Sequence, residues 1–143
     1  MSYVTLSQLT DRFGEQMLIA LTDRGADALG VVDTDVINRA LAETDALIDG
    51  YLSGRYALPL STTETLLVGV AGAIAIYTLH RYEAPEKIAA DYKMAIRTLE
   101  QLSNGTIKLT AAGVEAPSTG TTGVQITDRE RPFTEDNLKN GFI

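Results

Sequence analysis

The chain contains no cysteine and no tryptophan, and among its 143 residues there is a single histidine, His80. Without thiols it can form neither a disulfide framework nor a thiolate metal site, and one imidazole is too few for most zinc sites. Basic residues are also scarce, since 12 Lys and Arg against 19 Asp and Glu give a net charge of −7. This balance argues against a nucleic-acid-binding surface and against affinity for anionic membranes. These absences predict an interaction or structural protein that is not an enzyme and needs no cofactor.

Long hydrophobic runs are absent as well. The most apolar stretch, residues 66–79, has 14 residues, which is too short to span a bilayer and is typical of a buried core helix. The first ten residues have neither the basic nor the apolar region of a signal peptide. The sequence therefore predicts no membrane association, and its length fits one domain with an appendage.

Up to residue 104 the chain has helical patterning. Thr5 is placed to cap a short helix that ends at Gly14, and a second short helix is expected over residues 15–21. After a polar loop, apolar residues at i, i+3, i+4 and i+7 predict an amphipathic helix over residues 34–56.

The most apolar segment predicts a central helix over residues 63–82. Ser61 and Glu64 have the spacing of a capping box at its start, in which each side chain bonds the backbone N–H of the other residue. Gly69 and Gly72 in its interior each disfavour a helix by about 1 kcal/mol relative to alanine, so we expect close packing against another helix to offset them. Because the segment is hydrophobic nearly all round, neighbouring helices or other subunits must cover every side of it.

The last helix is expected to begin at Pro85 and to end before Gly105, which can adopt a left-handed conformation. Residues 106–109 alternate in polarity, which predicts a short strand. Residues 110–127 are rich in Thr, Gly and Ala and contain one charged side chain before Thr127. Ordering this stretch costs at least about 18 kcal/mol of backbone entropy. Its few aliphatic side chains cannot offset that cost, so disorder is predicted for the stretch in isolation.

These elements predict an all-α fold, a small bundle of about five helices over residues 1–104. An extended C-terminal arm over residues 105–143 follows, which can add a short strand or hairpin. The arm ends in an apolar hook that contains Phe133, Leu138, Phe142 and Ile143. An apolar hook beyond a long spacer adds nothing to the packing of the body, so we expect these side chains to contact a partner.

Three candidate chemical sites are weak. Residues 23–34 have acids at two positions of a calcium-binding EF-hand loop but lack its central glycine and final glutamate, which favours a solvated loop ending in a helix cap at Asp33. Asp45 and Asp49 lie on the polar face of their helix, which favours a solvated or intersubunit surface over a catalytic pair. His80 lies at a helix end with no nucleophile or carboxylate placed as its partner.

Tyr51, Arg55 and Tyr56 lie where the third helix ends, and two interpretations of them stay open. The tyrosine rings can pack at the edge of the core while Arg55 reaches solvent. Alternatively, this corner forms part of a subunit interface, where tyrosine and arginine are enriched.

Several short segments carry a resemblance to a known family, and they occur in the same order along the chain at residues 3–6, 12–14, 21–24, 48–52, 54–60 and 133–138. The most specific is DGYLSGRYALPL at residues 49–60. In these segments the chain resembles a family of Mu-like phage and prophage morphogenesis proteins. That family is similar to the head–tail connector, or adaptor, proteins of tailed phages, which are small helical proteins that form a ring below the portal.

The resemblance implies a structural protein of the virion neck, between portal and tail, that is assembled in the host cytoplasm. Its partners are then other copies of the chain in a ring, expected to be a dodecamer, the portal protein, and neck or tail proteins. Genome DNA passes through the acidic channel of such a ring without specific binding. The hook then contacts the portal or a neighbouring subunit. No catalytic residue or cofactor carries over from the family.

Two other functions remain open at this stage. The first is another neck or tail-completion role, that of a stopper or tail terminator, and such proteins are more often rich in β-structure. The second is a small cellular helical binding module that works as a monomer or dimer.

Overall fold

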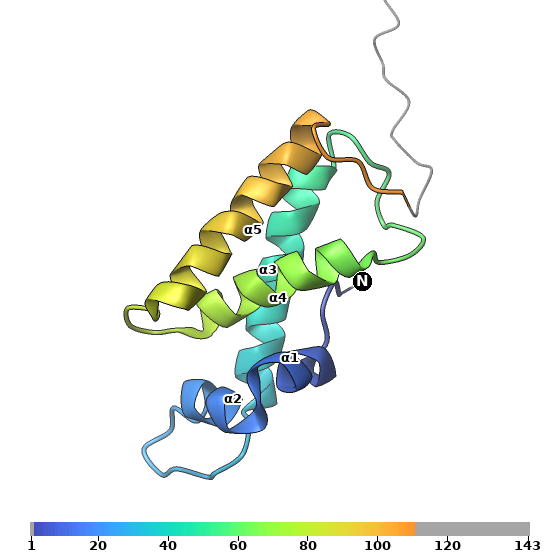
Figure 1. Ribbon diagram of the computed structural model, residues 1–143. Coiled ribbons are helices and arrows are strands. Elements are labelled where there is room, and N and C mark those ends of the chain that lie inside the picture. The colour runs from blue at the N-terminus through green and yellow to red at the C-terminus, as the bar shows by residue number, and fades with distance from the viewer. Residues whose placement is uncertain (1, 111–143) are drawn as a thin grey trace, which may run out of the picture.

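The computed structural model describes residues 2–110, which form five α-helices (Figure 1). They are α1 (Leu6–Phe13), α2 (Glu15–Thr22), α3 (Thr34–Leu52), α4 (Thr65–Leu79) and α5 (Glu86–Asn104). Residues 2–110 contain no strand, and the predicted all-α fold is confirmed. The expectations for residues 111–143, including those for the hook, lie outside the described residues.

The body of the fold is made by α3, α4 and α5. In Figure 1, α3 and α5 run in the same direction and converge at their C-terminal ends, and α4 lies across them. Nine of the 15 residues of α4 are buried, as expected for the most apolar segment of the chain. Two of its side chains are not covered, however, since Leu66 is 41% and Tyr77 37% exposed. The described body therefore covers most of α4 but not every side of it.

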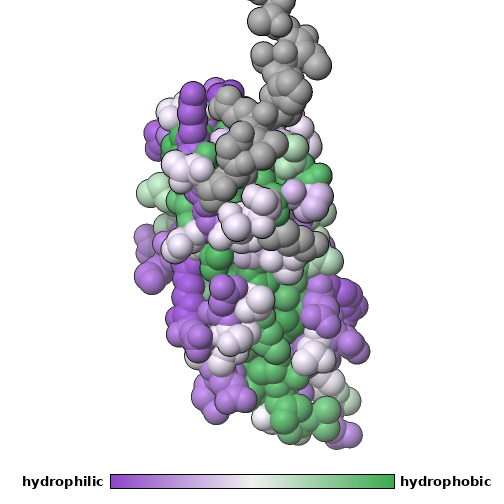
Figure 2. Space-filling view, turned by 90° about the vertical axis from the view of Figure 1, so that its right-hand side faces the viewer, coloured by the Kyte–Doolittle hydropathy of each residue, from purple (hydrophilic) through white to green (hydrophobic). Residues whose placement is uncertain are grey.

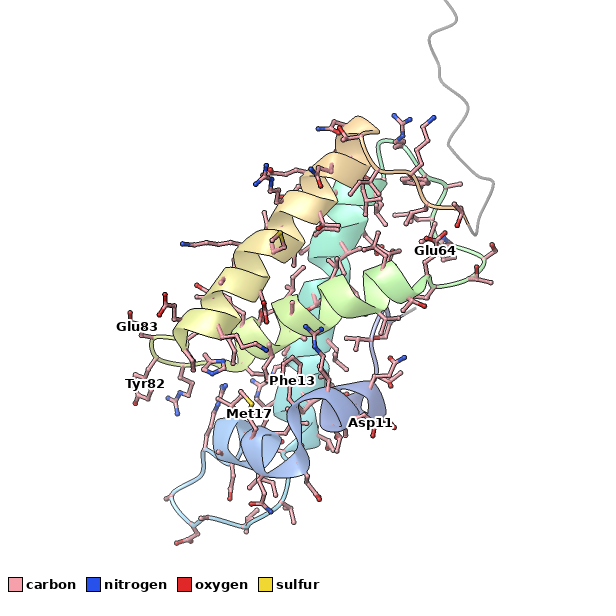
Figure 3. All side chains as sticks on the ribbon, in the orientation of Figure 1. Asp11, Phe13, Met17, Glu64, Tyr82 and Glu83 are labelled. Atoms are coloured by element: carbon pink, nitrogen blue, oxygen red, sulfur yellow. The ribbon has the colours of Figure 1, made fainter. Side chains whose placement is uncertain are left out.

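The two short N-terminal helices pack beneath α4, and their predicted caps are confirmed. Thr5 forms a capping box with Gln8 at the start of α1, and Gly14, with a φ of 88°, separates α1 from α2. Phe13 and Met17 lie between these helices and α4, where they pack against the core (Figure 3). The apolar faces of two helices of eight residues each thus extend the core beyond the larger helices.

The third helix ends at Leu52 and not at residue 56 as predicted. A turn follows, in which the N–H groups of both Arg55 and Tyr56 donate to the carbonyl of Leu52. This turn brings Tyr56 into the core, where it is 2% exposed. The helix thus ends four residues early because Tyr56 packs inward. At its start, Asp33 is the predicted cap and accepts hydrogen bonds from the N–H groups of Asp35 and Val36.

The capping box predicted for Ser61 and Glu64 is wrong. The N-cap residue of α4 is Glu64 itself, and its side chain makes no capping hydrogen bond. Instead, Glu64 Oε1 accepts a hydrogen bond of 3.2 Å from the hydroxyl of Thr110. A partner 46 residues away along the chain has replaced the local one. The helix also ends three residues earlier than residue 82, at Leu79.

The last helix follows Pro85 and ends at Gly105, which has the predicted left-handed conformation with a φ of 83°. The strand predicted over residues 106–109 is absent from the described structure. This segment folds back on the body instead: the N–H of Ile107 donates to the carbonyl of Gln101, and Leu109 is 8% exposed. No strand lies beside this segment in residues 2–110, so its alternating apolar residues, Ile107 and Leu109, pack against the helices.

The two glycines of α4 play different roles. A Cβ on Gly72 would lie 2.8 Å from Nη1 of Arg12, so this glycine allows the close approach of a side chain from α1. A Cβ on Gly69 would meet nothing within 4 Å. The expected close packing therefore holds at Gly72 and is wrong at Gly69.

Candidate interaction surfaces

Tyr56 belongs to the core of its own chain. Its ring is buried, and its hydroxyl accepts a hydrogen bond of 3.1 Å from the N–H of Leu109. This bond holds the segment after α5 against the loop after α3. Of the three residues predicted for a subunit interface, Tyr56 has almost no surface with which to contact a neighbour.

Arg55 is half-buried and lies against Gly105 at the end of α5. A Cβ on Gly105 would lie 2.6 Å from the guanidinium carbon of Arg55. The glycine therefore provides both the left-handed turn and the space for the arginine. Arg55 connects the C-terminal ends of α3 and α5, while part of its side chain remains accessible.

Tyr51 lines a groove between α3 and α5, which we call the α3–α5 groove. The groove has a volume of about 420 Å³ and is lined by Leu47, Tyr51, Tyr92, Lys93, Ile96, Arg97 and Glu100. Its apolar and aromatic side chains are half-buried, and its charged side chains are exposed. On α5, the ring of Tyr92 stacks on that of Tyr77 from α4, with 4.0 Å between ring centroids and an angle of 11° between planes. Of the three predicted interface residues, Tyr51 has the clearest position for contact with a partner.

A second groove lies between α4 and α5, beside α1, with a volume of about 400 Å³. Two exposed hydrophobic side chains line it, Leu66 at 41% and Met94 at 65% exposure. Arg12 lies at its edge, where Nη1 donates a hydrogen bond of 2.9 Å to the carbonyl of Gly69. Because Gly69 has no side chain, the floor of this α4–α5 groove stays open.

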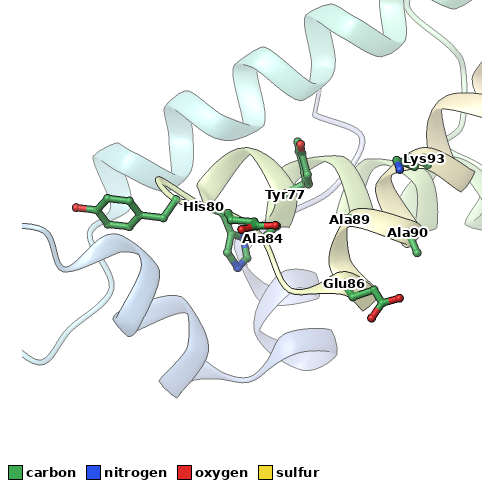
Figure 4. Close-up of a pocket in the computed structure, with 9 residues that line it drawn as sticks. Tyr77, His80, Ala84, Glu86, Ala89, Ala90 and Lys93 are labelled. Carbon is green, nitrogen blue, oxygen red and sulfur yellow. The ribbon is translucent and has the colours of Figure 1, made fainter.

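A hollow of about 760 Å³ surrounds the connection from α4 to α5 (Figure 4). His80 lines it, and the Nδ1 atom of this residue lies 2.7 Å from the carbonyl oxygen of Ile76, so the ring is held at the end of α4. Tyr82, also in the lining, projects from the connecting loop and is 87% exposed (Figure 3). Residues 2–110 contain no group of three or more His, Cys, Asp or Glu that could hold a metal ion. None of the helices in this part of the chain is long and apolar enough to cross a membrane.

Asp45 and Asp49 bind the N-terminal segment of the chain. Asp45 Oδ1 accepts a hydrogen bond of 2.9 Å from the N–H of Tyr3, and Asp49 Oδ1 accepts one from the hydroxyl of Tyr3. Both carboxylates are half-buried, so part of this polar face remains at the surface, and both have a partner within the chain. The pKa of Tyr3 is raised, chiefly by burial of its ring and also by the hydrogen bond to Asp49 and the negative charges of Asp49 and Asp45.

The loop between α2 and α3 is held by its own hydrogen bonds. Asp23, the first acidic residue of the EF-hand comparison, accepts a hydrogen bond of 2.9 Å from the N–H of Gly30. Arg24 Nη2 donates one of 2.6 Å to the carbonyl of Leu79, which fixes the loop to the C-terminal end of α4. Leu29 and Val31 remain 77% and 58% exposed in this loop. Figure 2 shows hydrophobic surface that continues to the lower end of the molecule, where Figure 1 places the loop.

Comparison with known proteins identifies the family. The sequence model of the family described as "Bacteriophage Mu, Gp36" matches residues 3–127. The chain belongs to this family. Gene product J of Escherichia phage Mu is 37% identical over 116 residues, which are 81% of this chain and 79% of that protein. The Mu-like prophage FluMu protein gp36 of Haemophilus influenzae is 37% identical over 78 residues, which are 54% of this chain and 55% of that protein.

The resemblance to Mu-like phage and prophage proteins is thus confirmed, and this member of the Gp36 family is a phage-type protein with an all-α body. The sequence singles out Tyr51 as a candidate interface residue but not the residues that line the α3–α5 groove with it, Tyr92, Lys93 and Arg97. These three lie more than 40 residues further along the chain. The spacing of Lys93 and Arg97, one turn apart on an amphipathic helix, was the signal in the sequence that could have indicated a basic edge.

Proposed function

We propose that this member of the Gp36 family is a head–tail connector, or adaptor, of a Mu-like phage. It forms a homo-oligomeric ring, of twelve copies in the simplest case, beneath the portal in the virion neck. There it joins the capsid to neck or tail proteins, and genome DNA passes through its channel without specific binding. In this proposal the ring carries no catalytic activity.

The observation that carries this proposal is the presence of different apolar surfaces on one small body. Leu29 and Val31 are exposed in the α2–α3 loop, whereas Leu66 and Met94 are exposed along the α4–α5 groove. In a ring each subunit meets its two neighbours through two different surfaces, because the contact is head-to-tail. A symmetric dimer needs one self-complementary surface. The two separate apolar surfaces therefore support a ring.

The charge of the chain supports the same function. With a net charge of −7, the chain provides few cations to neutralise phosphate groups. Phosphate contacts made by Lys and Arg release counterions and hold DNA in place, so a channel wall poor in cations lets DNA move. Acidic walls suit a ring through which the genome passes.

The competing functions have less support. Stopper and tail-terminator proteins are more often rich in β-structure, whereas residues 2–110 of this chain are all-α. A cellular binding module is disfavoured because the chain belongs to a phage family.

Cryo-electron microscopy of virions that carry this protein tests the proposal. The expected result is density that fits the five helices at the junction of portal and tail, with ring symmetry. Density for these helices elsewhere in the particle would overturn the proposal. Native mass spectrometry of the purified full-length protein with portal gives a second measure, and a persistent monomer at high concentration with portal present would also contradict it.

A further inference from the structure

The α3–α5 groove combines an apolar floor with a basic edge. Leu47 and Tyr51 from α3 and Tyr92 and Ile96 from α5 form the floor, and all four are half-buried. Such a surface can accept an aromatic ring in the offset or edge-to-face arrangements that aromatic side chains prefer. With about 420 Å³ of space, the groove accommodates a few side chains of a peptide segment.

The basic edge of the groove consists of two cations. Lys93 and Arg97 are exposed, lie one helical turn apart, and form no ion pair with another residue of the described part of the chain. Glu100 is the one acidic side chain in the lining. On a chain with a net charge of −7, two cations beside aromatic rings indicate a ligand that has both carboxylates and an aromatic residue.

We propose that residues 132–138 of this chain, PFTEDNL, dock in the α3–α5 groove. The segment has Phe133 for the aromatic floor, then Glu135 and Asp136 for the basic edge. Phe142, the other aromatic residue after Thr110, has no acidic residue within four positions and lacks this complementarity. The inference deepens the proposed function, on which it rests where the groove belongs to a neighbouring subunit of the ring.

The chain is long enough to make this contact. The described part ends at Thr110, whose hydroxyl is held by Glu64. Between Thr110 and Phe133 there are 23 residue steps, which span at most about 80 Å when extended. The 19 residues of α5 extend over only about 29 Å. The segment can therefore reach the groove of its own copy or that of an adjacent copy.

The other hollows of the described residues fit the segment less well. The hollow after α4 has Glu83 and Glu86 against the single cation Lys93, so its net negative charge repels Glu135 and Asp136. The α4–α5 groove has Asp91 opposite Arg12, so it offers no excess of positive charge. A hollow of about 180 Å³ between α3 and α4 has Arg24 and Arg39 against Glu43, but it has no aromatic side chain on which Phe133 could pack. The positive charge and the aromatic floor together select the α3–α5 groove.

Disulfide trapping in the full-length protein tests the contact, and the absence of native cysteine makes it specific. The variant carrying Glu100→Cys, at the groove, together with Thr134→Cys, in the segment, is oxidised under mild conditions. We expect most chains to become cross-linked. The matched control carries Glu15→Cys, an exposed glutamate of α2, with the same Thr134→Cys. Equal cross-linking in both variants, or none at the groove, would overturn the proposal.

Charge reversal gives a second measurement on the same cross-link. Adding Lys93→Glu and Arg97→Glu should lower its yield by about tenfold, because two charge pairs become repulsive. Adding Glu135→Lys and Asp136→Arg as well should restore the yield. Lys87→Glu, an exposed cation of α5 outside the groove, is the control and should leave the yield unchanged. A yield that does not respond to the reversal would contradict the charge complementarity and with it the proposed docking.

The result is separable from the proposed function. Native mass spectrometry of the same samples reports whether a ring forms. A ring without the cross-link overturns the docking and leaves the adaptor role standing. The cross-link without a ring supports the docking and overturns the adaptor role. Mixing the two single-cysteine variants shows whether the segment crosses to another copy, and docking in either copy supports the proposal.

Discussion

At the scale of single residues, Tyr3 shows how the start of the chain is held. Its ring is 4% exposed, and its N–H and hydroxyl bond to carboxylates on consecutive turns of α3, those of Asp45 and Asp49. Buried hydrogen bonds to charged groups are worth about 1.5–3 kcal/mol each. The tyrosine therefore anchors the segment before α1 to the C-terminal half of α3.

The raised pKa of Tyr3 makes this anchor dependent on pH. Because the pKa is higher in the folded state than the ordinary value of about 10, the stability it contributes is complete below pH 10 and is lost as the pH rises further. Tyr3→Phe should lower the free energy of unfolding by about 1–2 kcal/mol at pH 7. The difference from the wild type should shrink at pH 11.

Urea denaturation followed by circular dichroism at both pH values measures the difference. Tyr82→Phe is the control, since Tyr82 is 87% exposed and its replacement should change little at either pH. A Tyr3→Phe deficit that stays constant from pH 7 to pH 11 would show that the hydroxyl does not titrate as inferred.

Gly105 is a second residue with a strong local requirement. It has a φ of 83°, and Arg55 occupies the space where a Cβ would lie. Gly105→Ala should therefore lower the free energy of unfolding by more than about 1 kcal/mol. Gly54→Ala is the matched control, because Gly54 has no positive φ and its Cβ position is open. Thermal unfolding of the two variants measures the contrast, and equal midpoints would refute the packing of Arg55 on Gly105.

At the scale of elements, the sequence determined that five helices exist, but their ends were predictable only where the signals are local. The caps at Thr5, Asp33 and Gly105 are made by residues within a few positions of the helix, and all three were predicted. By contrast, Glu64 accepts a hydrogen bond from Thr110, and Tyr56 accepts one from Leu109, so both residues are positioned by contacts across the fold. No local pattern encodes these contacts, so the start of α4 and the end of α3 were misplaced.

In the α3–α5 groove, too, only the residue with a local sequence signal could be predicted. Tyr51 could be chosen from its neighbours in the sequence, since tyrosine and arginine close to a helix end suggest an interface. Its partners on α5 could not be chosen, because the register between α3 and α5 follows from how both pack against α4. The groove is a product of tertiary packing, and its basic edge became visible only with the fold.

The glycines within α3 and α4 allow a prediction of how alanine substitutions change the stability of these helices. Gly50 in α3 and Gly69 in α4 have open Cβ positions, and neither has a positive φ. Gly50→Ala and Gly69→Ala should each raise the free energy of unfolding by about 0.5–1 kcal/mol. Gly72→Ala should raise it less or lower it, because the new methyl group displaces Arg12 from its bond to Gly69. Chemical denaturation ranks the three variants, and a gain at Gly72 as large as that at Gly69 would contradict this account.

At the scale of the whole molecule, the proposed function assigns different roles to the acidic charge and to the exposed apolar side chains. The net charge of −7 disfavours contact with the phosphate groups of DNA, which suits the proposed channel. The exposed apolar side chains are spread over the loop before α3, the α4–α5 groove and the loop after α4, and under the proposed function they are the contacts with other proteins. A small body with several such places is suited to assembly with more than one neighbour.

The residues directly after α5 contribute to the stability of the body, so the position of a C-terminal truncation matters. Leu109 is buried, and its N–H bonds the hydroxyl of Tyr56, while Ile107 also packs on the core. Truncation after Gly105 removes these contacts and should lower the free energy of unfolding by at least about 3 kcal/mol, since the buried leucine and its hydrogen bond alone contribute that much and Ile107 adds to it. Truncation after Thr110 keeps them, so we expect this chain to be more stable than the one that ends at Gly105 by that amount.

Comparing these two truncations also separates folding from assembly. Under the proposed function, the chain that ends at Thr110 should keep its helical circular dichroism but bind portal at least about tenfold more weakly, since Phe142 and Ile143, the part of the hook outside the docked segment, are gone. Co-sedimentation with purified portal measures this binding, and the full-length chain is the reference. Full portal binding by the shorter chain would show that the body, and not the C-terminal segment, makes the attachment. Equal stability of the two truncations would show that Leu109 is not part of the core.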